Sequence, residues 1–202
     1  MTIARRFVAS RSFIPSLIVG ATSLVILLVL NPWLLLDPST PSGGDMGAHV
    51  YAPAYLRDVL LPSGRIGGWS NDWFAGFPLF YFYFPLPSLV IVFLDLFLPY
   101  GVAFKLATVV GLIGTPPAVY FMTRSFRFSS TVAAVAGSSA AVFVCMESFT
   151  IYGGTVASTL AGEFSYSWSF ALGFVYLGLL ARIVEGERHL IPRAVVVFAL
   201  AA

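Results

Sequence analysis

Three ionisable side chains stand out because they lie in or beside polar interruptions of a very apolar chain. They are Asp45 in "SGGDMGAHVYAPAYLRDVLL", Glu163 in "ESFTIYGGTVASTLAGEF" and Lys105 near the start of an apolar run. A carboxylate can accept the proton of an attacking hydroxyl group, and a lysine ammonium can hold a lipid phosphate as a point charge. Ionisable groups near membrane depth are costly, which makes them candidates for function.

Each of these residues also has a purely structural interpretation. Asp45 can cap a helix that begins near Met46, since Asp is a preferred N-cap residue, and on the residues alone capping is favoured. Glu163 can lie solvated or support the first turn of the next helix, and Lys105 can extend its ammonium to the membrane surface. His49 follows Asp45 by one helical turn, but two ligands without a third are weak evidence for a metal. The sequence therefore supports no metal site, and whether a divalent cation is needed stays open.

The surrounding chain is too apolar for a soluble domain. Of its 202 residues, 58% are hydrophobic and 10% are charged, whereas soluble domains carry about 25% charged residues. Several uncharged stretches approach the roughly 20 residues that a helix needs to cross a bilayer. We therefore expect an all-α fold, a polytopic transmembrane helical bundle in which residues 1–202 form a single domain. The expected spans are about 13–36, 102–123, 130–147 and 165–181, with a further helix from about 194.

Two segments are expected to differ from these spans. Residues 37–84 are polar and rich in Gly, Pro and aromatic residues, which predicts a loop at the outer face. Residues 85–98 are apolar but short, which favours a re-entrant or short span. Cys145 lies in an apolar run and is expected to be a small core residue. The chain ends inside a short apolar run, so we expect it to be incomplete at its C-terminus.

Basic residues predict the orientation. Cytoplasmic loops carry an excess of Lys and Arg, so all three basic groups, and the N-terminus with them, are expected in the cytoplasm. Residues 37–101 and 147–164 then share the outer face, provided that residues 85–98 do not cross. If residues 85–98 do cross, the 147–164 loop moves inside; we favour the first arrangement. The three groups are Arg5, Arg6 and Arg11; Arg124 and Arg127; and Arg182, Arg188 and Arg193.

Two longer stretches carry a family resemblance. "GGDMGAHVYAPAYLRDVLLPSGRIGGWSNDWFAGFPLFYFYFPLPSLV" and "YGGTVASTLAGEFSYSWSFAL" resemble the bacterial membrane proteins labelled 6-pyruvoyl-tetrahydropterin-synthase-related, a label that implies no pterin chemistry here. More broadly, the order of a first helix, an outer loop opening with an acidic residue, and a later helix with an early basic residue is similar to the N-terminal module of the GT-C superfamily. Those proteins are membrane glycosyltransferases that use polyprenyl-phosphate sugars.

The resemblance implies roles for particular residues. Asp45 matches the acidic residue that serves as base or binds the acceptor or a metal, Glu163 matches a second acidic residue, and Lys105 matches a basic residue that meets the donor phosphate. Asp45 stands alone, whereas the family pattern has an acidic pair. The aromatic stretch from Trp69 to Tyr83 would line the entry for lipid and sugar. The residues expected to line the substrate site are His49, Arg57, Trp69, Trp73 and Tyr81.

The sequence therefore predicts a membrane glycosyltransferase module at the outer face of a bacterial inner membrane. Its donor would be a lipid-linked, polyprenyl-phosphate sugar, and it would take part in cell-envelope glycan assembly. Membrane lipids and the lipid-linked sugar are the expected partners; no nucleic acid is expected, and the oligomeric state is left open. Broken helices with polar residues at membrane depth also suit a transporter or lipid flippase, and a non-catalytic membrane scaffold is the third alternative.

Overall fold

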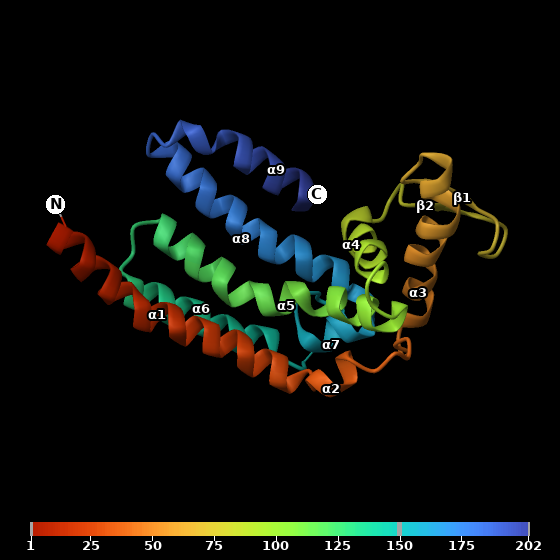
Figure 1. Ribbon diagram of the computed structural model, residues 1–202, viewed down its shortest axis with the longest axis horizontal. Helices are drawn as coiled ribbons and strands as arrows, with labels where there is room; N and C mark the ends of the chain where they lie inside the picture. Colours follow the sequence, from red (N-terminus) through yellow and green to blue (C-terminus); the bar gives the residue numbers. More distant parts are fainter. Residues whose placement is uncertain (1, 149–150, 202) are drawn as a thin grey trace.

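The structure is a computed structural model that describes residues 2–148 and 151–201, with side chains described from residue 13 onward. The described chain is mostly helical with almost no strand, as predicted. Arg5, Arg6 and Arg11 lie outside the described side chains. Long helices form a bundle along the longest axis of the molecule, and shorter elements gather at one end (Figure 1).

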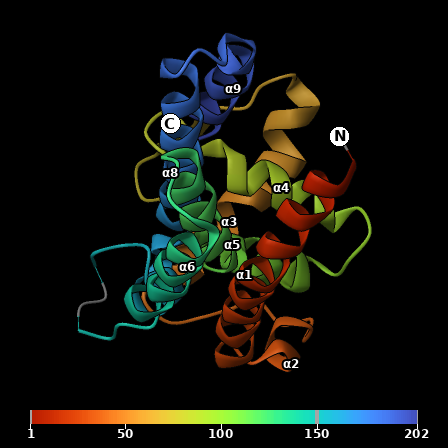
Figure 2. The same cartoon turned by 90° about the vertical axis from the view of Figure 1, so that its left-hand side faces the viewer.

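Helix α5 is the centre of the bundle. It packs against α1, α4, α6 and α8, and α8 packs in turn against α9. Figure 2 looks onto the bundle from the end that carries the N-terminus. The bundle helices are α1 (Thr2–Val29), α4 (Pro85–Asp95), α5 (Tyr100–Ser125), α6 (Ser130–Val144), α8 (Phe164–Val184) and α9 (Ile191–Ala201).

The shorter elements surround the end where the acidic residues lie. Helix α3 is extended by a π-helical turn and a 3-10 turn, and β1 pairs antiparallel with β2, with Trp69 opposite Pro78. A second π-helical turn leads from α7 into α8. These elements are α2 (Pro32–Leu35), α3 (Met46–Tyr55), the turns Leu56–Leu60 and Leu61–Ser63, β1 (Gly68–Ser70), β2 (Phe77–Leu79), α7 (Val156–Ser158) and the turn Thr159–Glu163. The 3-10 turn Arg188–Leu190 lies at the opposite end, between α8 and α9.

The first predicted span differs from the observed helix. A single helix was expected over residues 13–36, but α1 ends at Val29 and a separate α2 follows. Asn31 between them adopts a left-handed conformation with φ 54°, and Pro32 cannot donate a hydrogen bond to the preceding turn. Cys145 also differs from expectation, because it follows the end of α6 and is exposed rather than in the core.

Two helices of the described chain are long and apolar enough to cross a membrane. They are Tyr100–Ser125, with mean hydropathy 1.5, and the combined segment Val156–Val184, with mean hydropathy 1.6. Phe13–Val29, Pro85–Asp95 and Ser130–Val144 are shorter apolar helices. With 11 residues, α4 is about 16 Å long, roughly half the thickness of a bilayer core.

A shared core fixes the segments that carry the two acidic residues. Met46 directly follows Asp45, and Phe164 directly follows Glu163. Both apolar side chains are buried in one cluster with Ile91 of α4 and with Phe104 and Ala107 of α5. The chain therefore anchors each acidic residue through its neighbour.

Candidate functional site

Two glycine-containing turns bring the segments of Asp45 and Glu163 together. The Asp45 backbone N–H donates to the Ala161 carbonyl over 2.8 Å. Gly44 has φ +49°, and a Cβ there would lie 2.4 Å from the Ala161 oxygen. Gly162 has φ +133°, and a Cβ there would lie 2.9 Å from the Asp45 Cβ. Only glycine suits such positive φ angles at so close an approach.

Asp45 occupies the N-cap position of α3, but its side chain makes no capping hydrogen bond. Its carbonyl accepts from the Ala48 and His49 backbone N–H groups, while the residue as a whole remains exposed. The interpretation of the Asp45 side chain as a helix cap is therefore wrong. The carboxylate is available at the edge of the cavity described next.

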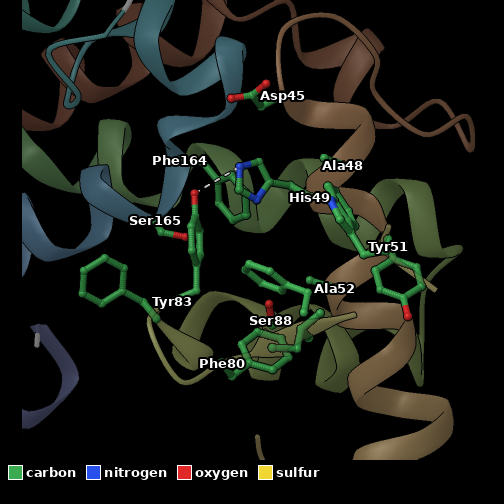
Figure 3. Close-up of a pocket in the computed structure, with 14 residues that line it drawn as sticks. Asp45, Ala48, His49, Tyr51, Ala52, Phe80, Tyr83, Ser88, Phe164 and Ser165 are labelled. Atoms are coloured by element: carbon green, nitrogen blue, oxygen red, sulfur yellow. Dashed lines mark hydrogen bonds between the residues drawn. The ribbon is translucent and has the colours of Figure 1, made fainter. Parts of the chain in front are cut away.

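A cavity of about 300 Å³ lies between α3, the β1–β2 segment, the start of α4 and the start of α8. Figure 3 shows Asp45 at one rim, with His49, Tyr83 and Phe164 beside it and Tyr51 on the far side. Most of the wall is aromatic or aliphatic. The lining residues are Asp45, Ala48, His49, Tyr51, Ala52, Trp73, Phe77, Leu79, Phe80, Tyr83, Phe84, Ser88, Phe164 and Ser165.

The His49 imidazole is held in one orientation by its neighbours. Its Nε2 lies 3.2 Å from the Tyr83 hydroxyl, and its ring meets the Phe164 ring edge-on with centroids 5.5 Å apart. On another side, a Cβ at Gly162 would lie 3.3 Å from the His49 ring. These contacts fix the position of the His49 ring, which lines the cavity.

Burial keeps both partners of this hydrogen bond neutral. Desolvation lowers the pKa of His49 below its usual value, against the opposing effect of the Asp45 and Glu163 charges. Burial raises the pKa of Tyr83, and the charges of Glu163 and Asp45 raise it further. At neutral pH both side chains are therefore uncharged and can serve as hydrogen-bond donors or acceptors.

The opposite wall is a fixed aromatic surface. The Tyr51 hydroxyl donates to Asp72 Oδ2 over 2.8 Å and lies 2.5 Å from the Ser70 hydroxyl. Burial raises the pKa of Tyr51 to about 12. The Trp73 ring packs between the Tyr51 and Phe77 rings, with centroid distances of 6.1 and 6.2 Å. Trp73 thus lies at the wall of the cavity.

The other predicted site residues lie elsewhere. Glu163 is exposed and does not line the cavity, although its charge acts on His49 and Tyr83. Trp69 and Tyr81 are exposed and, like Arg57, do not line the cavity. The stretch from Trp69 to Tyr83 nevertheless supplies Trp73, Phe77, Leu79, Phe80 and Tyr83 to the lining.

Two basic residues that were predicted to contact the substrate, Lys105 and Arg57, instead bond groups of the protein. The Lys105 ammonium donates to the Leu34 and Asp37 carbonyls over 2.7 and 2.6 Å, and its side chain is only 12% exposed. The Arg57 guanidinium bonds Asp58 and Asp95. A phosphate at Lys105 would have to compete with these carbonyls.

The described residues contain no group of three or more His, Cys, Asp or Glu side chains placed to hold a metal ion. The pair of Asp45 and His49 thus gains no third ligand of these types in that part of the chain. Ser88 and Ser165 also line the cavity; the sequence analysis did not identify them, and no motif or spacing marks them.

Comparisons with models of protein families, with curated proteins and with solved structures found no match for this chain.

Proposed function

We propose that this chain is a membrane glycosyltransferase module of the GT-C type, as its sequence resemblance implies. It would transfer a sugar from a polyprenyl-phosphate donor to an acceptor hydroxyl at the outer face of a bacterial inner membrane, in the assembly of a cell-envelope glycan. The observation that carries the proposal is the uncommitted Asp45 carboxylate at the rim of a cavity, fixed there by backbone docking against residues 161–162.

The chemistry assigns a role to each group near Asp45. The acceptor oxygen attacks the anomeric carbon, the bond from that carbon to the phosphate oxygen breaks, and the polyprenyl phosphate leaves. Asp45 takes the acceptor proton as general base. The neutral His49 and Tyr83 pair orients the acceptor, and the Glu163 charge stabilises positive charge that develops on the sugar ring.

Apolar outer surfaces support the membrane location. Large aliphatic side chains are exposed along the bundle, among them Leu28 of α1, Val142 of α6 and Val195 of α9 at 60, 77 and 61%. Many exposed large apolar side chains on several helices are what a chain in contact with an apolar phase would carry. Together with the two long apolar helices, this surface suits a lipid environment.

Transfer by the purified protein from a polyprenyl-phosphate sugar to added glycan acceptors tests the proposal. Asp45→Asn should lower the rate about a hundredfold or more, because Asn keeps the size of Asp but cannot take the proton. Glu163→Gln should lower the rate while leaving acceptor KM nearly unchanged.

Glu147→Gln is the matched control, because this acid is exposed and does not line the cavity. The control should keep the wild-type rate. Equal turnover by wild type, Asp45→Asn and Glu163→Gln would remove both catalytic assignments, and a wild-type protein without transferase activity would remove the proposed function.

A further inference from the structure

Two serine hydroxyls in the cavity have no protein partner. Ser88 of α4 is 5% exposed and Ser165 of α8 is 6% exposed. Both residues line the cavity, and neither side chain makes a hydrogen bond among the described residues. Each hydroxyl oxygen stays accessible from the cavity, since the enclosed hydroxyl without a partner in this part of the chain is that of Thr159. Figure 3 shows both hydroxyls on the inner side of the ring of lining side chains. A hydroxyl that opens into a cavity and is not used by the protein can bond a ligand there without breaking a protein hydrogen bond.

Other buried hydroxyls on the bundle helices donate to a backbone carbonyl of their own helix. Thr108 and Ser125 of α5 donate to the carbonyl four residues earlier, and Ser167 of α8 donates to the carbonyl three residues earlier. Such back-bonding is the usual solution for a helical serine. At Ser165 the carbonyl four residues earlier is that of Ala161, which already accepts from the Asp45 N–H. The Asp45 N–H therefore occupies the carbonyl to which Ser165 would otherwise donate.

The charge of the cavity limits what can enter it. No lysine or arginine is among its lining residues in the described chain, while Asp45 lines it and Glu163 lies within electrostatic reach. The cations at Lys105 and Arg57 are held by other protein groups. A phosphate in the cavity would therefore meet the Asp45 carboxylate, with the Glu163 charge nearby and no cation in the lining, which is unfavourable.

A neutral ring that carries hydroxyl groups suits this cavity better than a phosphate does, because it brings no negative charge. Its hydroxyls can bond Ser88, Ser165, His49 and Tyr83, and its apolar faces can lie against Trp73 and the neighbouring phenylalanines. We infer that the cavity is the acceptor subsite, that it takes a neutral hexopyranose, and that Ser88 and Ser165 bind the sugar hydroxyls. The acceptor is then a glycan. The assignment to the acceptor rests on the proposed function, whereas binding of a neutral sugar does not.

Ligand-observed saturation-transfer NMR on the protein in phosphatidylcholine nanodiscs tests the inference. Sugar-based detergents must be absent because they would compete. The probes are methyl α-D-glucopyranoside, methyl α-D-mannopyranoside and methyl α-D-galactopyranoside, with glucose 6-phosphate as the charged comparison. At least one methyl glycoside should bind, and glucose 6-phosphate should bind more weakly. Ser88→Ala and Ser165→Ala should each raise the Kd by about threefold to tenfold, the effect of one hydrogen bond.

Ser125→Ala is the matched control, since Ser125 is also 5% exposed but donates to the Phe121 carbonyl and lies outside the cavity. It should leave sugar binding unchanged and lower the Tm. Ser88→Ala and Ser165→Ala should weaken sugar binding and leave the Tm unchanged, because they lose no protein hydrogen bond. Absence of binding by all three glycosides, equal binding of glucose 6-phosphate, or unchanged Kd in both cavity variants would overturn the inference.

These outcomes are separable from the test of the proposed function. A protein that binds methyl glycosides through Ser88 and Ser165 but transfers no sugar keeps the subsite and loses the proposed activity. A protein that transfers sugar with an acceptor KM unchanged in both serine variants keeps the activity and loses the subsite.

Discussion

At Asp45 the backbone and the side chain have separate roles. The residue begins α3 and its carbonyl accepts the first hydrogen bonds of the helix, yet its carboxylate caps nothing. An acidic residue at this position usually bonds the N–H groups of the first turn. Here the backbone N–H of Asp45 is used by Ala161, so the docking of two segments, rather than capping, sets the position of the carboxylate.

His49 should make the stability of the protein depend on pH. Burial lowers its folded-state pKa below the unfolded value of about 6.5. Between these two values the unfolded chain binds a proton that the folded chain excludes, so stability falls as pH decreases. The stabilising effect of the neutral imidazole is complete above the unfolded pKa and is lost as the pH falls towards the folded pKa.

Thermal unfolding between pH 7.5 and 5 measures this dependence. We expect the Tm of the wild-type protein to fall more steeply with decreasing pH than that of His49→Gln. His189→Gln is the control, because His189 is exposed near the opposite end of the bundle and its loss should leave the wild-type slope. A steeper loss of Tm in His49→Gln than in wild type would contradict the assigned direction of the pKa shift.

At the scale of the elements, the site depends on the contact between the start of α3 and the end of the π-helical turn before α8. Gly44 and Gly162 allow it, because each has a positive φ and each faces the other segment at a distance that excludes a Cβ. Met46 and Phe164 hold the two segments in the core beneath. A side chain added at either glycine must separate the segments or distort them.

Gly44→Ala and Gly162→Ala should each destabilise the protein by about 1–3 kcal/mol through strain alone, and should weaken sugar binding because Asp45 and His49 are displaced. Gly47→Ala is the control: Gly47 lies in α3, nothing is within 4 Å of a Cβ there, and alanine favours a helix by about 1 kcal/mol over glycine. Chemical denaturation and the glycoside Kd measure both effects. Equal stability of Gly44→Ala and Gly47→Ala would contradict the docking.

The helices were predictable from the sequence to a greater degree than the site. Apolar runs and their interruptions placed the helices α5, α6 and α8 and the short α4, because burial in core or lipid acts on every residue of a run. The cavity arises from a contact between residues 45 and 161, which no local pattern reports. Lys105 shows the same limit. Its ammonium bonds the carbonyls of Leu34 and Asp37 at the end of α2, about 70 positions earlier in the chain, and no local pattern reports such a contact.

At the scale of the whole molecule, two turns that carry arginines lie at one end of the bundle and the cavity lies towards the other. The N-terminus, the α5–α6 turn and the α8–α9 turn lie at one end, and α2, α3, α7 and the β1–β2 hairpin lie towards the other (Figure 1). The two turns at the first end carry Arg127 and Arg188. Because basic segments favour the cytoplasm, this division supports the proposed orientation, with the cavity at the outer face.

Cysteine accessibility should reveal this orientation directly. In a Cys145→Ser background, which removes the exposed native thiol, Asp45→Cys and Glu163→Cys should both react with a membrane-impermeant maleimide added to intact spheroplasts. Arg188→Cys, exposed at the opposite end, should react only after permeabilisation. Residues 45 and 163 are expected on one side because the Asp45 N–H donates to the Ala161 carbonyl. An α4 of about 16 Å agrees with this, since it is too short to cross a hydrocarbon core of about 30 Å. Reaction of Glu163→Cys only after permeabilisation would contradict the contact between the two segments, and reaction of both site positions from either side would favour a transporter with alternating access.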